Sequence, residues 1–147
     1  MTSGESLVRV KLLRPGARLP LRGTALSSGF DLYACLGDEA VHLSQVPTLI
    51  PTGLAMEVPA GLDAQIRPRS GLARQGILST FGTLDADYRG ELMVALYTTS
   101  PDVHYTVHDG DRIGQIVITR LVDVSFIAVG ALTQTERGSG GHGSTGR

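Results

Sequence analysis

Gly82-Thr83-Leu84-Asp85-Ala86-Asp87-Tyr88-Arg89-Gly90 is the stretch around which the rest of the chain is organised. It is short, bracketed by glycines and flanked by apolar segments typical of strands, which predicts the tip of a β-hairpin. A turn needs only glycine and one Asp or Asn. This one carries two carboxylates, a phenol and a guanidinium within five residues. We therefore predict that the turn has a chemical role as well as a structural one.

Short strand patterns, separated by glycine and proline, occupy most of the chain on both sides of this turn. The expected strands cover residues 8–12, 28–34, 48–58, 62–68, 77–84, 91–98, a segment near 105, 112–119 and 124–129. Only residues 68–73 suggest a helix. Many short strands with at most one short helix predict an all-β fold, either a jelly roll or a distorted β-barrel.

Length and composition exclude several classes of protein. A chain of 147 residues is most simply one domain with a substantial core. The formal net charge of −1 argues against a nucleic-acid binder that relies on a basic surface. Cys35 is the only cysteine, so disulfides within the chain and zinc sites built from cysteines are excluded. Without a membrane-length apolar run or a signal-peptide pattern, we expect a soluble cytoplasmic protein with no nucleic-acid or membrane partner.

The C-terminal segment has a different composition from the rest. Residues 137–147 contain five glycines and no aliphatic side chain, so they cannot bury enough surface to offset their ordering entropy. We expect a core over residues 1–132 and a flexible glycine-rich arm over residues 133–147. Backbone N–H groups with Ser, Thr and Arg donors suit phosphate oxygens, so the arm could close over a polyphosphate. An ordinary flexible terminus is the alternative.

Two further clusters of hydrogen-bond donors lie within the core. Arg69-Ser70-Gly71 follows a strand and combines a planar cation, a hydroxyl and an approachable backbone, although a helix-start turn with a surface arginine would look the same. The segment 110–115 begins as a plain hairpin turn, and Gln115 is unusually polar for a strand. Both clusters are candidates for binding phosphate.

The acidic and imidazole side chains allow fewer kinds of site. Asp85 and Asp87 are not expected to form a carboxylate pair that shares one proton. One of them, helped by a divalent cation, could activate a water, and two solvated turn carboxylates are the alternative. His104 and His108 lie too far apart on a strand, roughly 13 Å, to share one ion, and we interpret both as surface residues.

Five segments, in order, resemble the five motifs of the homotrimeric dUTP pyrophosphatases (dUTPases). They are residues 28–34, 68–73, 82–90, 110–115 and 137–146, and they span nearly the whole chain. The resemblance implies a β jelly-roll subunit and a homotrimer with active sites shared between subunits. It also implies hydrolysis of dUTP to dUMP and pyrophosphate with Mg²⁺ as the cofactor.

The resemblance also implies a role for individual residues. Asp85 is the base that orients and deprotonates the attacking water, and Asp31 reaches the metal through water. Tyr88 packs against the deoxyribose where a 2′-hydroxyl would lie. The other substrate-binding residues implied are Gly82, Thr83, Leu84 and Met93 for uracil; Arg69, Ser70, Gly71 and Gln115 for phosphates; Ser79 near the base; and Arg137, His142, Gly143, Ser144 and Thr145 in the arm.

Three positions depart from the family pattern. Ser79 lies where many bacterial members of the family carry an Asn near the base. His142 lies where the family usually has a Phe that stacks on uracil, so we expect weaker substrate retention and some dependence on pH. Phe81 is bulkier than the residue often found before the motif glycine, and we expect it to reshape the pocket wall.

Two other functions are weighed against dUTP hydrolysis. The related dCTP deaminases have Arg-Ser-Ser and Asp-Pro-Gly at the corresponding motifs and a catalytic Glu before the turn, whereas no Glu lies between Gly71 and Asp85. A non-catalytic dUTPase-like regulator that binds nucleotide or protein partners is the second. Loss of Asp85 or of the arm would favour it, and both are present.

Overall fold

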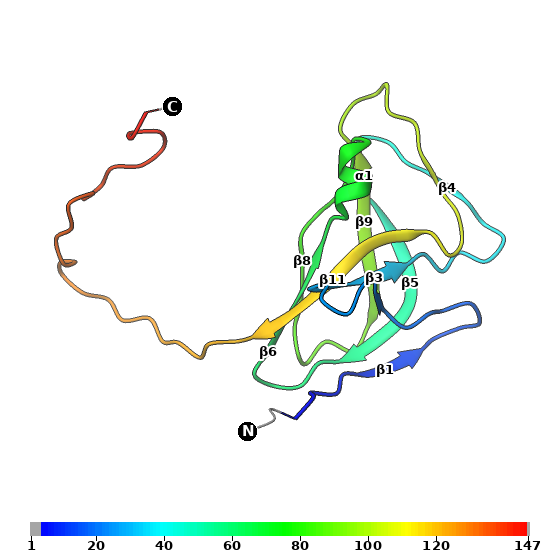
Figure 1. Cartoon of the computed structure of the whole chain (residues 1–147), viewed down its shortest axis with the longest axis horizontal. Helices are drawn as coiled ribbons and strands as arrows, with labels where there is room; N and C mark the ends of the chain where they lie inside the picture. Colours follow the sequence, from blue (N-terminus) through cyan, green and yellow to red (C-terminus); the bar gives the residue numbers. More distant parts are fainter. Residues whose placement is uncertain (1–3, 147) are drawn as a thin grey trace.

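The computed structural model describes residues 4–146 as a strand-rich body with a long C-terminal segment outside it (Figure 1). The elements are β1 (Arg9–Leu12), β2 (Leu21–Arg22), β3 (Gly29–Tyr33), β4 (Val41–His42), β5 (Thr48–Glu57), β6 (Leu62–Arg67), α1 (Ser70–Arg74), β7 (Ile77–Ser79), β8 (Gly82–Leu84), β9 (Glu91–Thr98), β10 (Thr106–Val107) and β11 (Arg112–Arg120). Within residues 4–146, no helix is long and apolar enough to cross a membrane.

The strands form antiparallel sheets, which confirms the all-β prediction. One sheet has the order β1-β5-β9-β7 and a second the order β2-β3-β11-β6-β8, with a small β10-β4 pair at one end. Neighbours in each sheet are mostly distant in sequence, as expected for the crossing connections of a jelly roll. The short helix α1 connects β6 to β7 and confirms the single helical segment that the sequence predicted.

The core lies between the two larger sheets. Alternate side chains of β9 are buried, as the period-two pattern of a half-buried strand requires. Leu96 of β9 and Ile50 of β5 lie in the same cluster as Ile116 of β11 and Leu32 of β3, so both sheets contribute. Burying each such side chain stabilises the fold by about 1.5–3 kcal/mol. This packing fixes the strand ends from which the functional loops emerge.

The segment 82–90 connects the two sheets, so the hairpin prediction is wrong. β8 pairs with β6, where Gly82 lies opposite Ile66, whereas β9 pairs with β5 and β7. Leu84 and Leu92, on either side of the turn, are buried in one core from opposite sheets. Apolar alternation in short flanking strands shows that each strand has a buried face, but not whether the two strands pair with one another. We call residues 82–90 the crossover segment.

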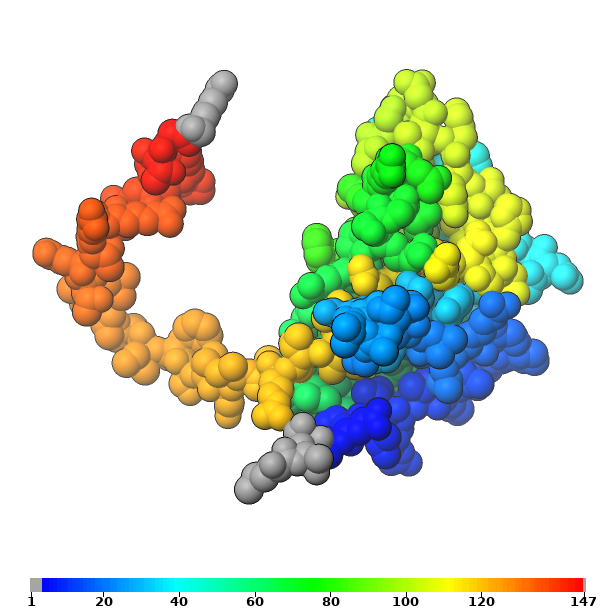
Figure 2. Space-filling model, viewed as in Figure 1, coloured from blue at the N-terminus to red at the C-terminus, as the bar shows by residue number. Residues whose placement is uncertain are grey.

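The C-terminal segment leaves the body after β11 (Figure 2). Residues 121–146, as far as the structure describes the chain, form no helix or strand, so the strand predicted at 124–129 is wrong for the single chain. Phe126 is 96% exposed and Ile127 is 82% exposed. A strand forms only where a neighbouring strand pairs with it, and residues 124–129 have no such neighbour among residues 4–146. From here on we call residues 121–146 the arm; the glycine-rich part predicted at 133–147 forms its end, and residue 147 lies outside the described residues.

Candidate active site

A pocket of about 330 Å³ lies beside the crossover segment, and we call it the crossover pocket. It is lined by Leu49, Ile66, Gly82, Thr83, Leu84, Asp85, Tyr88, Glu91, Leu92 and Met93. The strands β6, β8 and β9 supply an apolar wall, and the turn supplies a carboxylate and a phenol. Such a pocket suits a flat, partly apolar ligand whose orientation is fixed by a few polar groups.

The two carboxylates of the turn face different hollows. Asp85 lines the crossover pocket, whereas Asp87 lines a separate hollow of about 480 Å³ that also contains Arg9 and Glu57. The two carboxylates therefore line no common pocket. Asp85 is exposed, and none of the residues that the structure describes pairs with its carboxylate. It is therefore free to contact a ligand or a water in the pocket.

Tyr88 is held against the start of β9. Its hydroxyl donates a hydrogen bond to the backbone oxygen of Glu91 at 3.0 Å, and its backbone N–H donates to the oxygen of Asp85 at 3.0 Å. A side chain at position 90 would overlap the hydroxyl of Tyr88, so Gly90 is needed where it stands. Tyr88 is 46% exposed and turns one part of its ring toward the pocket.

Arg89 braces the crossover segment. Its Nη1 donates to the backbone oxygen of Ala86 at 2.6 Å, and its Nη2 lies 3.4 Å from the carboxylate of Glu57 on β5. The guanidinium that made the turn look chemically active therefore has a structural role in this chain.

A second pocket, of about 230 Å³, lies where β3, β11 and the start of α1 meet, and we call it the polar pocket. It is lined by Gly23, Ser27, Gly29, Asp31, Arg69, Ser70, Gly71, Arg112 and Gln115. Arg69 Nε lies 3.1 Å from one oxygen of Asp31, and Arg112 Nη1 lies 3.7 Å from the other. Two guanidinium groups against one carboxylate leave an excess of positive charge, which suits phosphate.

Gln115 reaches the polar pocket because Gly29 leaves room for it. Its Nε2 donates to the backbone oxygen of Pro68 at 2.8 Å, which ties β11 to the turn before α1. A Cβ at position 29 would overlap the Gln115 amide. The polar residue that looked out of place in a strand is therefore fixed at the pocket.

Comparison with known proteins shows the family of the chain. The family model described as dUTPase matches residues 16–146. The chain belongs to the dUTPase family. It is 46% identical over 147 residues to a deoxyuridine 5′-triphosphate nucleotidohydrolase of Treponema pallidum subsp. pallidum, covering 95% of this chain and 99% of the relative. It is 42% identical over 144 residues to the protein of that name from Fusobacterium nucleatum subsp. nucleatum, covering 95% and 98%.

A solved structure shows the same fold. The dUTPase of Staphylococcus bacteriophage 80alpha, in a variant form with dUpNHpp, superposes on the chain with a TM-score of 0.86 at 24% identity. The superposition covers 97% of this chain and 100% of the phage chain. At this level of identity the likeness shows the fold alone.

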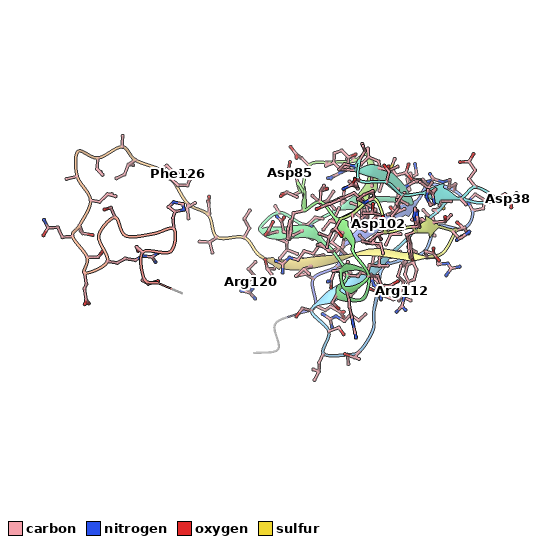
Figure 3. All side chains as sticks on the ribbon, turned by 90° about the horizontal axis from the view of Figure 1, so that it is seen from above. Asp38, Asp85, Asp102, Arg112, Arg120 and Phe126 are labelled. Carbon is pink, nitrogen blue, oxygen red and sulfur yellow. The ribbon has the colours of Figure 1, made fainter. Side chains whose placement is uncertain are left out.

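The structure of this dUTPase-family chain gathers most of the expected site residues into two separate groups. Those expected at the base, sugar and water line the crossover pocket; they are Gly82, Thr83, Leu84, Asp85, Tyr88 and Met93. Those expected at phosphates and metal line the polar pocket; they are Asp31, Arg69, Ser70, Gly71 and Gln115. In the view of Figure 3, Asp85 lies on the upper side of the body and Arg112 on its lower side. One chain of this dUTPase family therefore presents two partial sites.

Other expected residues lie outside both pockets. Ser79 is buried in β7 and lines neither pocket; its hydroxyl has no hydrogen-bond partner among residues 4–146. Phe81 is 77% exposed and lines neither pocket, so the expectation that it reshapes the crossover pocket wall is wrong. In the arm, Arg137 bonds only locally, with its Nε donating to Gly140 at 2.7 Å. The remaining arm residues expected at the substrate, also away from both pockets, are His142, Gly143, Ser144 and Thr145.

Sequence reasoning missed four residues that line the polar pocket: Gly23, Ser27, Gly29 and Arg112. Arg112 lies inside the motif at 110–115, but a strand-start arginine carries no signal of its own. Ser27 and Gly23 come from the loop between β2 and β3, whose position depends on strand pairing. Only the steric need for glycine at position 29, next to a polar strand residue, could have been suspected from the sequence.

Proposed function

We propose that this protein hydrolyses dUTP to dUMP and pyrophosphate. The observation that carries the proposal is the free carboxylate of Asp85 at a pocket sized for a nucleoside, beside the ring of Tyr88. The two relatives named deoxyuridine 5′-triphosphate nucleotidohydrolase support the same activity. Asp85 accepts a proton from a water that attacks the α-phosphorus, and the pyrophosphate group leaves from the opposite side.

Uracil recognition follows from the position of β8 at the end of its sheet. β8 pairs with β6 on one side only, so the backbone groups of its other edge are free to bond a ligand. Uracil carries donors and acceptors along one edge, and the extended backbone of Gly82, Thr83 and Leu84 offers matching groups. A thymine methyl group has no room against a fixed backbone, and this steric exclusion discriminates more strongly than methyl burial, which is worth only ~1–3 kcal/mol.

The ring of Tyr88 selects the sugar. It is fixed by a hydrogen bond from its hydroxyl to β9 and packs against the position of the sugar 2′-carbon. A ribose hydroxyl at that carbon would collide with the ring, whereas deoxyribose fits. Met93, 36% exposed on the returning strand, forms the facing wall.

The polar pocket binds the phosphates. Arg69, Ser70 and Gln115 provide a guanidinium, a hydroxyl and an amide in one small pocket. Magnesium commonly binds through one or two carboxylates and the substrate phosphates while it keeps several waters. Among the described residues no cluster of three or more potential ligands is present, and the Asp31 carboxylate is paired with Arg69 and Arg112. Asp31 therefore fits a contact through water, and the ion would neutralise phosphate charge.

Each active site is shared between copies of the chain in a homotrimer. A triphosphate must touch both the crossover pocket and the polar pocket, yet in one chain the two pockets share no lining residue. The arm projects away from both, and its exposed apolar side chains need a partner surface. Arg137, Ser144 and Thr145 then clamp the β- and γ-phosphates at a site on a neighbouring copy, where closure excludes water.

Pyrophosphate release from dUTP by the purified protein is the most informative experiment, with dCTP, dTTP and UTP as controls. We expect rapid release from dUTP with Mg²⁺ and little from the other three. Ammonia release from dCTP would show a deaminase instead. Tight binding of dUTP without any product would show a regulator that has lost catalysis.

A further inference from the structure

A bulge interrupts β5 opposite the first residue of β9. Pro51 of β5 pairs with Met93 of β9, and the next paired residues are Ala55 and Glu91. The stretch of β5 between these two pairs is therefore longer than the facing stretch of β9. Gly53 sits inside the bulge with φ of +72°, and a Cβ there would lie 2.8 Å from the Cβ of Ala17. Only glycine fits this position without strain, so the bulge is a fixed feature of the strand.

Side chains replace the ladder hydrogen bonds that the bulge removes. Glu91 Oε1 accepts the buried backbone N–H of Gly53 at 2.8 Å, and Thr52 Oγ1 donates to the backbone oxygen of Leu92 at 2.6 Å. A buried N–H left without a partner would cost stability, so the carboxylate of Glu91 satisfies a requirement that the bulge creates. The start of β9 is therefore attached to β5 through the side chain of Glu91.

Arg14 fixes the Glu91 carboxylate from the other side. Its Nη2 lies 2.6 Å from Glu91 Oε1 and also donates to the backbone oxygen of Cys35 at 3.3 Å. The hydrogen bond from Arg14 holds the pKa of Glu91 below its ordinary value, and the Gly53 N–H acts in the same direction against desolvation. Neither Arg14 nor Glu91 is assigned a contact with the nucleotide by the motifs of the sequence.

The backbone oxygen of the same Glu91 accepts the hydroxyl of Tyr88 at 3.0 Å. The network therefore runs from Arg14 and Gly53 through Glu91 to the ring beside the expected sugar position. We propose that Glu91, anchored by Arg14 and the Gly53 amide, is a positioning residue that holds Tyr88 against the sugar and thereby sets the preference for deoxyribose over ribose. This inference rests on the proposed function, because Tyr88 must first be the residue that meets the sugar.

The test compares hydrolysis of dUTP and UTP by the full chain and its variants. Glu91→Ala removes the acceptor for Arg14 and Gly53, and we expect the ratio of kcat/KM for dUTP to that for UTP to fall about tenfold. Glu91→Gln keeps an oxygen in the same place and is expected to retain most of this preference. Arg14→Met leaves Glu91 bonded to Gly53 alone and should fall between the two.

A matched control separates positioning from general loss of stability. Asp109 also accepts two backbone N–H groups, from Leu36 at 2.8 Å and Gly37 at 3.2 Å, and lines neither pocket. Asp109→Asn should lower the unfolding midpoint without changing the substrate ratio. Far-UV circular dichroism identifies any variant that fails to fold, and in that case Arg14→Met and Glu91→Gln carry the test.

The outcomes separate this inference from the proposed function. If the unmodified protein does not release pyrophosphate from dUTP, the proposed function is wrong. If it does, and Tyr88→Ala admits UTP while a folded Glu91→Ala keeps the full preference for dUTP, the positioning role is wrong. An equal loss with both substrates for Glu91→Ala would also overturn it, because a structural defect does not distinguish sugars.

Discussion

The crossover segment and the arm both contain more than one glycine, yet only the first has a defined place in the single chain. Residues 82–90 are held at both ends by buried strands and braced internally by Arg89 and Tyr88. After the hydrogen bond from the Leu121 N–H to the Gly61 oxygen at its start, the arm has no such anchors among residues 4–146, and its large side chains are exposed (Figure 3). Glycine gives a segment conformational freedom, and the contacts of its neighbours decide whether that freedom is removed within the chain or only by a ligand or partner.

Replacing Asp85 should have the largest effect on activity. Asp85→Asn keeps the shape of the crossover pocket but removes the proton acceptor, so we expect kcat to fall by about 10²–10⁴-fold. Nucleotide binding, measured by calorimetry with a non-hydrolysable analogue, should be retained. Asp87→Asn is the control, because Asp87 lines a different hollow. Near-normal turnover by Asp85→Asn would contradict the assignment of the base.

Removing residues 133–147 tests the independence of the arm from the body. We expect kcat/KM for dUTP to fall roughly 100-fold, because closure over the phosphates is lost. The unfolding midpoint should stay the same, since residues 133–146 make hydrogen bonds only with one another and no ion pair with the body. A clear drop in the midpoint by scanning calorimetry would show that the arm contributes to the packed fold.

Gly90→Ala tests the rigidity of the crossover segment. The added methyl group would overlap the Tyr88 hydroxyl, displace the ring and break its bond to β9. We expect about a tenfold loss of kcat/KM for dUTP, which corresponds to ~1.4 kcal/mol. Gly4→Ala is the control, because a Cβ there meets nothing within 4 Å. Unchanged kinetics for Gly90→Ala would show that the position of Tyr88 does not matter.

The ion pair between Glu91 and Arg14, at the start of β9, should make the stability of the protein depend on pH. The pKa of Glu91 is lowered in the folded state, mainly by the hydrogen bond from Arg14. The ionised Glu91 carboxylate therefore contributes to the free energy of unfolding above the pKa of an unfolded Glu, near ~4.3. This contribution is lost as the pH falls through the lower pKa that Glu91 has in the folded protein. Glu91→Gln should cost about 1 kcal/mol in unfolding free energy at neutral pH. The difference in unfolding free energy between the two proteins, measured by urea titration, should shrink as the pH is lowered below the unfolded value, and a difference that stays constant would contradict the ionic contribution.

The smallest change is expected at position 142 in the arm. A phenyl ring offers more stacking area than imidazole, so His142→Phe should lower KM for dUTP about two- to threefold. It should also remove any dependence of KM on pH between about pH 5.5 and 8, where histidine changes charge. Michaelis constants measured across that range check both points, and identical profiles would show that the residue does not meet the base.

The sequence by itself determined the all-β class, the extent of most strands and the residue types of the site. Those depend on local periodicity, on the positions of glycine and proline, and on motifs whose spacing along the chain is fixed. For example, the strand expected at 91–98 agrees with β9 residue by residue.

Only the tertiary structure decided which strands pair and which distant residues those pairings bring together. It made the segment 82–90 a connection between sheets, placed Arg69 and Gln115 in one pocket with Asp31, and left the segment at 124–129 without a strand. It also joined Arg14, Gly53 and Glu91, which are far apart in sequence. Pairing depends on the burial of distant side chains and on partners for backbone hydrogen bonds, and neither is encoded within any short stretch of the chain.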